Sequence, residues 1–344
     1  MTSKDIIVAE GWDLVSRVVK AVLAVVVIIV VLVAVIVITA PKDEVVVIGQ
    51  TERLAAIPDD AVKVTPDMDL NAPVIHYDDW ADPVPMASPI STAGAEDSPF
   101  ITPNGTWFFF FFTPDASVPA EQQLTDGVTG IWWSHLVGDE WSSPEKINLC
   151  DDVSLDGAQF VLGKTMWFAS IRTGNYNEID IYTASYKDGV WTDVENAGEQ
   201  LNVDYDIGEF HITSDGETMY FHTGDLDYGE DMDIWVTHLV SGSWTEPEKV
   251  VGVNSEHMDG YPYISYDGRE MWFTSDVSTL GYAGPAIFRS VLLSNGTWST
   301  PVEIVSNFAG EPTLDADGNL YFVHHYFDAE SQMLEADIYV AYAQ

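Results

Sequence analysis

Basic residues and cysteines are what this sequence has least of. Only 13 of its 344 residues are lysine or arginine, against 55 aspartates and glutamates, and the net charge is −42. A surface this acidic repels phosphate groups, so the composition argues against nucleic-acid binding. The one cysteine, Cys150, excludes an intramolecular disulfide, and the fold must therefore depend on packing alone.

Two further patterns are missing. No glycine-rich loop follows a predicted strand and opens a helix, so nucleotide binding is unsupported. The eight histidines are scattered without the spacing of a zinc site. The acidic residues, by contrast, occur along the whole chain. This spread favours adaptation to high salt, which screens self-repulsion, over a surface that collects cations.

An apolar run near the N-terminus predicts a membrane anchor. Residues 21–40 are apolar and uncharged, which is long enough to cross ~30 Å of hydrocarbon. Lys4, Arg17 and Lys20 precede the run, and the positive-inside rule then leaves the N-terminus in the cytoplasm and the rest of the chain outside the cell. A cleaved signal peptide is the alternative, but Pro41 follows its best cleavage site. We expect an uncleaved, single-pass signal anchor in the cell membrane.

Internal repetition is the strongest signal beyond the anchor. A Trp-x-x-Pro segment recurs at intervals of roughly 50 residues, which is typical of a repeat architecture. Its copies begin at Trp80, Trp141, Trp244 and Trp298, with a weaker one at Trp191. Between them lie two strand-like runs joined by an Asp-Gly or Asn-Gly turn, followed by an Asp-Ile-Tyr type strand. Four short antiparallel strands make one propeller blade, and the chain holds five such units.

The two ends of the repeat predict that the ring closes. The last unit, from Glu311 to Gln344, has three strands, whereas the Trp80 segment precedes any complete unit. We expect the Trp80 segment to supply the missing fourth strand of the last blade, since this pairing removes an exposed edge. An open β-solenoid is the alternative, but it leaves the offset ends unexplained.

These predictions define the fold class and the domains. The fold class is all-β: a five-bladed β-propeller of four-stranded antiparallel blades, preceded by one transmembrane α-helix. The predicted domains are a short cytoplasmic N-terminus (1–20), the transmembrane helix (21–40), a linker or stalk rich in proline and charge (41–72), and the propeller (73–344).

The repeat also resembles a known family. Ser214-Asp215-Gly216, followed by Asp233-Ile234-Trp235 and then by Trp244 to Pro247, resembles the TolB-like, WD-type β-propeller repeat. The resemblance covers about residues 75–344, although propellers of that family often have six or more blades. It implies extracytoplasmic binding or scaffolding, and it implies no single activity, because fold alone does not determine function.

Acidic residues near the start of each innermost strand are the main site candidates. They are Asp97, Asp156, Glu209, Asp259 and Glu311. Five carboxylates converging on the propeller axis would suit Ca²⁺, which takes oxygen ligands, and we predict no other cofactor. The alternative is that they are solvated turn residues of a very acidic protein. His211 is a further ligand-binding candidate, since it is expected to face the channel.

The leading functional hypothesis is a membrane-anchored binding or scaffolding module that recognises a protein, glycan or cell-surface ligand with the propeller face. It assigns no catalytic residue. The alternative is a surface glycoside hydrolase that uses Asp97, Asp156 and Glu209, with an inverting acid and base about 6.5–9.5 Å apart. Asn104 and Asn295 begin glycosylation sequons on predicted turns, usable only if the domain lies outside the cell.

Overall fold

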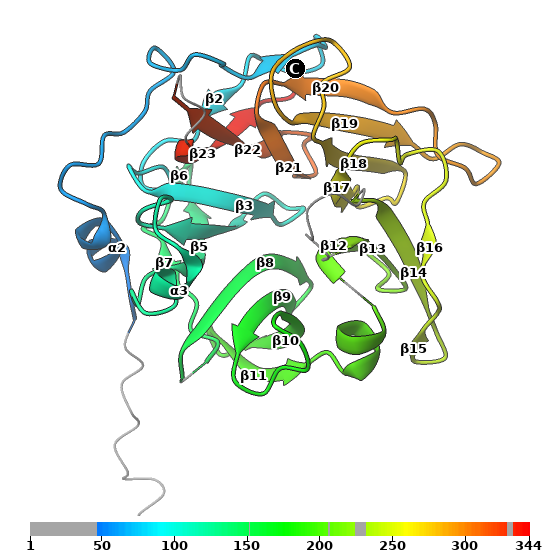
Figure 1. Ribbon diagram of the computed structural model, residues 1–344, viewed down its shortest axis with the longest axis horizontal. Helices are drawn as coiled ribbons and strands as arrows, with labels where there is room; N and C mark the ends of the chain where they lie inside the picture. Colours follow the sequence, from blue (N-terminus) through cyan, green and yellow to red (C-terminus); the bar gives the residue numbers. More distant parts are fainter. Residues whose placement is uncertain (1–46, 151, 206, 224–231, 329–332) are drawn as a thin grey trace, which may run out of the picture. The chain divides into compact units, whose positions relative to one another are not determined.

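The described part of the chain is built from five antiparallel sheets arranged around one axis (Figure 1). The structure is a computed structural model that describes residues 47–344 except 151, 206, 224–231 and 329–332. The transmembrane helix predicted over residues 21–40 lies outside these residues. Within them, no helix has the length and apolar character needed to cross a membrane.

The first three blades follow one another along the chain. The first contains β3 (Ala95–Ile101), β4 (Trp107–Thr113), β5 (Gly130–Val137) and β6 (Glu140–Trp141), with β7 (Glu145–Lys146) also on β5. The second contains β8 (Ser154–Leu162), β9 (Thr165–Arg172), β10 (Asp180–Lys187) and β11 (Val190–Asn196). The third contains β12 (Ile207–Ile212), β13 (Thr218–Thr223), β14 (Ile234–Val240) and β15 (Ser243–Trp244), with β16 (Glu248–Lys249) also on β14.

The last two blades each recruit a strand from before the first blade. The fourth contains β17 (Asp259–Ile264), β18 (Glu270–Ser275), β19 (Ala286–Val291), β20 (Val302–Ser306) and β1 (Val74–Ile75). The fifth contains β21 (Ala309–Leu314), β22 (Leu320–Phe327), β23 (Met333–Ala341) and β2 (Val84–Pro85). Three short helical segments complete the described chain: α2 (Gln50–Ala56), α3 (Ala120–Gln123) and the π-helical turn η1 (Gln200–Asp204).

The ring closes as the sequence predicted. In the fifth blade Val84 lies opposite Val340 and Pro85 opposite Tyr339, and Trp80 forms a bridge with Ala343. Each innermost strand also contacts the innermost strands of both neighbouring blades, including β21 with β3 across the seam. The described residues therefore form a closed five-bladed propeller and not an open solenoid. The strand β1, which pairs with β20, was not predicted.

Glycine turns and interblade packing explain why this sequence forms blades. Gly216, at the end of the first hairpin of the third blade, has φ of +76°, and its N–H donates to Thr213 O at 2.8 Å. Such positive φ favours glycine and turns the chain tightly. Between blades, aromatic and branched side chains bury one another. Across the seam, for example, Phe110 and Trp132 of the first blade pack with Tyr321 and Ile338 of the fifth.

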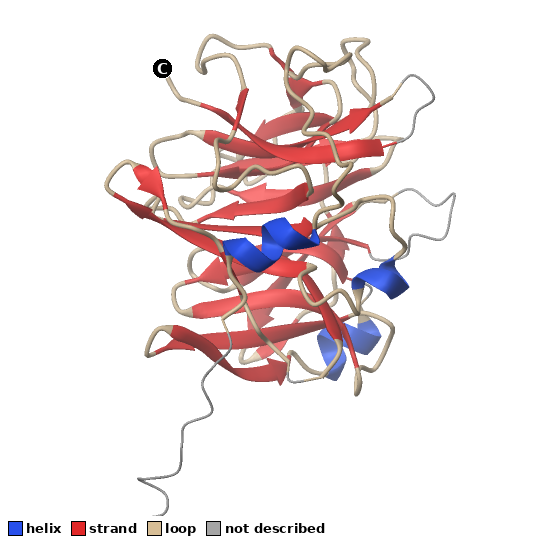
Figure 2. Ribbon diagram, turned by 90° about the vertical axis from the view of Figure 1, so that its left-hand side faces the viewer, coloured by secondary structure: helices blue, strands red, loops and turns tan. Residues whose placement is uncertain are grey.

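Residues 47–72, which we call the N-terminal strap, differ from the predicted stalk. They follow the rim of the propeller and pack against it, with α2 lying at the edge of the first blade (Figures 1 and 2). Arg53 of α2 is completely buried, and its Nη2 lies 2.6 Å from Glu96 Oε1. Its guanidinium also stands 4.4 Å from the ring centre of Phe112, a cation–π distance.

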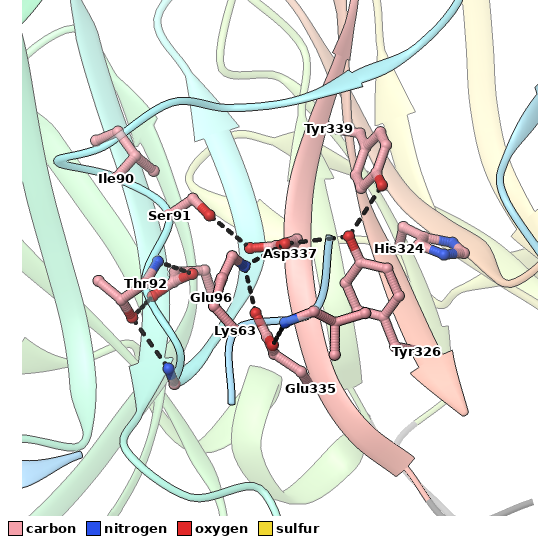
Figure 3. A network of polar contacts seen from close by, with 12 residues as sticks. Lys63, Ile90, Ser91, Thr92, Glu96, His324, Tyr326, Glu335, Asp337 and Tyr339 are labelled. Carbon is pink, nitrogen blue, oxygen red and sulfur yellow. Dashed lines mark hydrogen bonds and ion pairs between the residues drawn. The ribbon is translucent and has the colours of Figure 1, made fainter. Parts of the chain in front are cut away.

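Further along, the strap is held to the fifth blade. Lys63 forms ion pairs with Glu335 and Asp337 of β23, as Figure 3 shows. Asp69 Oδ2 lies 3.0 Å from His324 Nε2 of β22. Single charged side chains, each with a buried partner, fix the segment in place. It needs no apolar face for this attachment, so its sequence shows no hydrophobic periodicity and has the composition of a linker.

Candidate functional site: the axial channel

A bulge at the same register of every innermost strand shapes the channel. The pairing of β3, β8, β12, β17 and β21 with the next strand shifts at one shared place. Five residues of these bulges line one small axial cavity of about 50 Å³: Ser98, Ala158, Glu209, Tyr261 and Glu311. Four of them, all except Glu209, have φ between +44° and +53°. Backbone strain of this kind in non-glycine residues often marks a functional position.

Aromatic side chains close the channel two residues beyond the bulge. Phe160 lies 4.4 Å from His211 between ring centres, and His211 lies 4.7 Å from Tyr263. Phe100 completes this group through an edge-on contact with Phe160 at 5.3 Å. We call these four residues the aromatic plug. The predicted candidate His211 therefore does face the channel, but burial lowers its pKa to about 3, so it is a neutral packing group.

The plug separates two different chambers. On the side of the Asp-Gly turns lies a mouth of about 590 Å³, whose floor is the aromatic plug and whose walls include Trp107, Leu162 and Tyr266. On the other side lies the 50 Å³ chamber at the bulges, which is rich in carboxylates. A second mouth of about 420 Å³ adjoins this chamber and shares Glu209 and Tyr261 with it.

Three of the five predicted acids come together, and two do not. Asp97, Glu209 and Glu311 lie close enough that the charge of Asp97 raises the pKa of both glutamates, and Glu311 is hydrogen-bonded to Asp97. Asp156 lines a different cavity, between the first two blades, and pairs with Arg172 at 2.7 Å. The carboxylate of Asp259 accepts hydrogen bonds from the backbone and hydroxyl of Ser255. The predicted five-acid ring is therefore wrong in its membership.

The bulge is the physical reason for this difference. Asp156 and Asp259 lie two residues before the bulge position of their strands, whereas Glu209 and Glu311 occupy it. Among the described residues, no group of three or more His, Cys, Asp or Glu is arranged as a metal site. Calcium binding stays a prediction, and the hydrolase trio of the alternative hypothesis lacks Asp156 at the channel.

The pKa values of the three channel carboxyls are shifted in different directions. Burial would raise the pKa of Asp97, but the hydrogen bond and charge of His325, together with the Ser98 N–H, hold that pKa below its usual value. Burial, and then the charge of Asp97, raises the pKa of Glu209 to about 8. Burial, Asp97 and Glu209 together raise the pKa of Glu311 well above its usual value. Near neutral pH, Asp97 is therefore ionised and Glu209 holds a proton.

Replacing Glu209 with glutamine should therefore change how stability depends on pH. Between about pH 4.5 and pH 8, the folded protein holds a proton on Glu209 that the unfolded chain releases, so wild-type stability falls as pH rises through this window. Glutamine does not titrate, so the melting temperature of Glu209→Gln relative to wild type should increase from about pH 5 to about pH 9. Thermal melts of both proteins at matched salt measure this change.

A control variant separates this effect from the general acidity of the chain. The hydroxyl of Thr213 lowers the pKa of the exposed Asp215. The difference in melting temperature between Asp215→Asn and wild type should therefore be constant above about pH 5. A Glu209→Gln difference that stayed equally flat would show that Glu209 is ionised throughout this range.

The aspartates of the Asp-Ile-Tyr type strands have structural partners. The carboxylate of Asp180 accepts from the backbone of Tyr176, and Asp233 pairs with Lys249. Asp337 holds Lys63 of the strap. The channel residues that were not predicted are Ser98, Gln159, Tyr261 and the residues of the aromatic plug other than His211. An alignment of the units on the proline after the bulge, in Ser98-Pro99, Tyr261-Pro262 and Glu311-Pro312, would have placed the first residue of each pair in one register.

The fold and the site together define a class: a closed five-bladed β-propeller whose channel is blocked by aromatic side chains and carries buried carboxyls beneath them. No protein-family model matches the sequence. No curated protein matches it either. The similarity that exists is therefore one of structure.

Several solved structures are similar in fold. TolB from Acinetobacter baumannii shares 14% identity at a TM-score of 0.44, over 74% of this chain and 56% of that protein. A protein assigned as TolB from Agrobacterium tumefaciens shares 15% identity at a TM-score of 0.43, over 74% of this chain and 91% of its own. An α-L-arabinofuranosidase from Lactobacillus brevis shares 14% identity at a TM-score of 0.43, over 74% of this chain and 91% of its own. This chain thus spans just over half of the Acinetobacter protein. At TM-scores below 0.5 these likenesses support no conclusion about this chain, and its propeller fold rests on its own strand pairing.

Proposed function

We propose that this protein is a membrane-anchored binding module that holds a protein segment in the aromatic mouth of its propeller, outside the cell. The observation that carries the proposal is the blind shape of this mouth. The aromatic plug forms a closed floor under a cavity of about 590 Å³, which is within the usual range of ligand pockets. Apolar walls above such a floor favour binding of an apolar side chain.

The lining of the mouth favours binding over catalysis. None of the described residues that line it is a carboxylate, lysine or arginine, and the neutral His211 is a poor proton acceptor. Acidic turns adjoin the rim, because Asp215 follows Ser214 and Asp267 follows Tyr266, and both Ser214 and Tyr266 line the mouth. A fitting ligand is a segment with an apolar side chain flanked by lysine or arginine, since opposite charge guides the encounter.

The anchor is the second part of the proposal. The uncharged apolar run at residues 21–40 supports it, as does the lysine and arginine on its N-terminal side. An anchored module keeps its ligand at the membrane, which suits recognition of a partner at the cell surface.

Liposome flotation of the full-length protein tests both parts together. The probe is an unstructured peptide with one phenylalanine between lysines, and its controls replace the phenylalanine with serine or the lysines with glutamates. We expect the protein to float with lipid after washes with high salt and carbonate, and to carry the lysine–phenylalanine peptide with it. Tyr266→Ala, which truncates a 65% exposed wall residue, should weaken peptide binding roughly fivefold or more.

The matched variant is Tyr342→Ala, because Tyr342 is 51% exposed and does not line the mouth. It should leave peptide binding unchanged. Equal losses in both variants, or binding of an oligosaccharide and not of the peptide, would overturn the assignment of the mouth to a protein segment. Protein that washes off the lipid would overturn the anchor.

A further inference from the structure

The chamber on the other side of the plug contains buried hydrogen-bond acceptors without a partner. Gln159 is 5% exposed and lines this chamber, yet its Oε1 has no hydrogen-bond partner among the described residues. The Oε2 atom of Glu311 is also buried without a hydrogen-bond partner among the described residues. The Oε1 atom of Glu209 has only a long contact of 3.5 Å with the hydroxyl of Ser98. Buried acceptors without donors cost stability, so this group is suited to a bound donor.

Positive charge is also scarce around these acceptors. The ionisable side chains around the chamber are Asp97, Glu209, Glu311, Tyr261, His211 and His325. None of them is a lysine or arginine. Burial lowers the pKa of His211 to about 3, and His325 Nε2 stands 3.7 Å from Asp97 Oδ2. Burial and the charge of Asp97 keep Glu209 protonated at neutral pH, as described above. A cation that enters the chamber would replace this proton and donate to the unpartnered acceptors.

We propose that the carboxylate chamber binds the primary ammonium group of an alkylamine that enters through the second mouth. An ammonium carries three donors and no acceptor, which matches Gln159 Oε1, Glu209 and Glu311 Oε2. The chamber volume of about 50 Å³ admits one small head group, since a water occupies about 30 Å³. The proposal is independent of the ligand at the aromatic mouth, which lies beyond the plug.

The second mouth has room for the rest of such a molecule. Its volume is about 420 Å³, and Ala169, Leu201 and Ile207 give it apolar walls for an alkyl chain. Asn177 and Asn202 add polar groups further out. The ligand class is therefore an alkyl chain that ends in –NH₃⁺, either a lysine side chain of a polypeptide or a free diamine.

The backbone around Glu209 is rigidly supported. The ring nitrogens of His222 lie 3.2 Å and 3.0 Å from the amide nitrogens of Glu209 and Tyr261, and the neutral ring accepts a hydrogen bond from one of these two amides. A side chain at residue 208 would collide with His222, since a Cβ there would lie 2.2 Å from Nε2, so glycine is required for this contact. The bulge that carries Glu209 into the channel is thereby held in one geometry, which favours a preorganised site.

Calorimetric titration of the full-length protein at low salt and neutral pH tests the proposal. The probes are cadaverine and Nα-acetyl-lysine methylamide, and pentanol is the uncharged control. We expect saturable binding of one ammonium ligand per chain, no binding of pentanol, and proton release, because the ligand displaces protons held near Glu209. If cadaverine binds and the lysine derivative does not, the ligand is a free amine, and the reverse indicates a polypeptide.

Two variants distinguish the chamber from the general acidity of the protein. Glu209→Gln keeps the shape of the side chain and should weaken amine binding roughly tenfold or more. Glu178→Gln removes a carboxylate from the outer part of the same mouth and should change binding less than roughly threefold. Near-ultraviolet circular dichroism shows whether each variant is folded. Equal losses in the two variants, or binding of Ca²⁺ without binding of either amine, would overturn the proposal.

Discussion

Arg53→Met should lower the free energy of unfolding by about 3–5 kcal/mol, the range for breaking one side of a buried ion pair. Arg53 and Glu96 are both 0% exposed, and Arg53 also donates to the backbone carbonyls of Pro89 and Ile90. Its removal leaves Glu96 buried without a cation. Burial raises the pKa of Glu96, and the charge of Arg53 opposes this rise, so the loss of Arg53 disfavours the ionised carboxylate further. Denaturant unfolding of the chain from Val47 onward measures the loss.

Two comparisons show whether the buried pair is responsible. The double variant Arg53→Met with Glu96→Gln should recover part of the loss, because glutamine still accepts from the Thr92 N–H and leaves no buried charge. Lys187→Met removes an exposed cation paired with Asp193, and it should leave the midpoint of denaturant unfolding almost unchanged. If Arg53→Met behaved like Lys187→Met, the strap would not be fastened by this pair.

A chain that begins at residue 87 should fail to form a stable monomer. It lacks β2, so β23 would become an exposed edge with unpaired N–H and C=O groups, which promotes aggregation. It also loses Met86 from the interface between the first and fifth blades. Size-exclusion chromatography and near-ultraviolet circular dichroism should show associated material without fixed tertiary packing.

Two related chains serve as controls. A chain that begins at residue 73 keeps β1 and β2 but lacks the strap, and it should fold with reduced stability. The second chain begins at residue 87 and carries residues 79–86 after Gln344, joined through a short turn. This connection suits the geometry, because the Gln344 N–H donates to Asp79 O at 2.9 Å. The added strand should restore the folded monomer. Equal stability of the chains that begin at 73 and 87 would contradict the role of β2.

The fold was predictable because it repeats. Five copies of one pattern average out local ambiguity, and the offset ends of the repeat indicated that the Trp80 segment pairs with the chain's tail. The site was harder, because a bulge shifts every following side chain by one position. Asp156 and Glu209 look equivalent in the sequence, yet they occupy different registers, and only Glu209 reaches the axial chamber. A one-residue error in register changes which side chains face the axis.

The strap could not be predicted for a different reason. Arg53, Lys63 and Asp69 occur at irregular intervals in a segment with prolines, which is the composition of a linker. Each of them finds a partner that is distant in the sequence, namely Glu96, Asp337 and His324. Contacts of this kind depend on tertiary structure, and a single sequence contains no periodic signal for them.

The strap also determines where mechanical load enters the domain. Along the chain, α2 comes before the closing strand β2, and its Arg53 is fixed beneath the first blade. A pull transmitted through the residues before Val47 would therefore act first on the pairing of Gly49 with Glu145 and then on this buried guanidinium, both of which precede β2. The hydrogen bonds of β2, which complete the circle of blades, carry tension only after that attachment has failed. The strap would thus shield the pairing of β2 with β23 from a pull on the N-terminal residues.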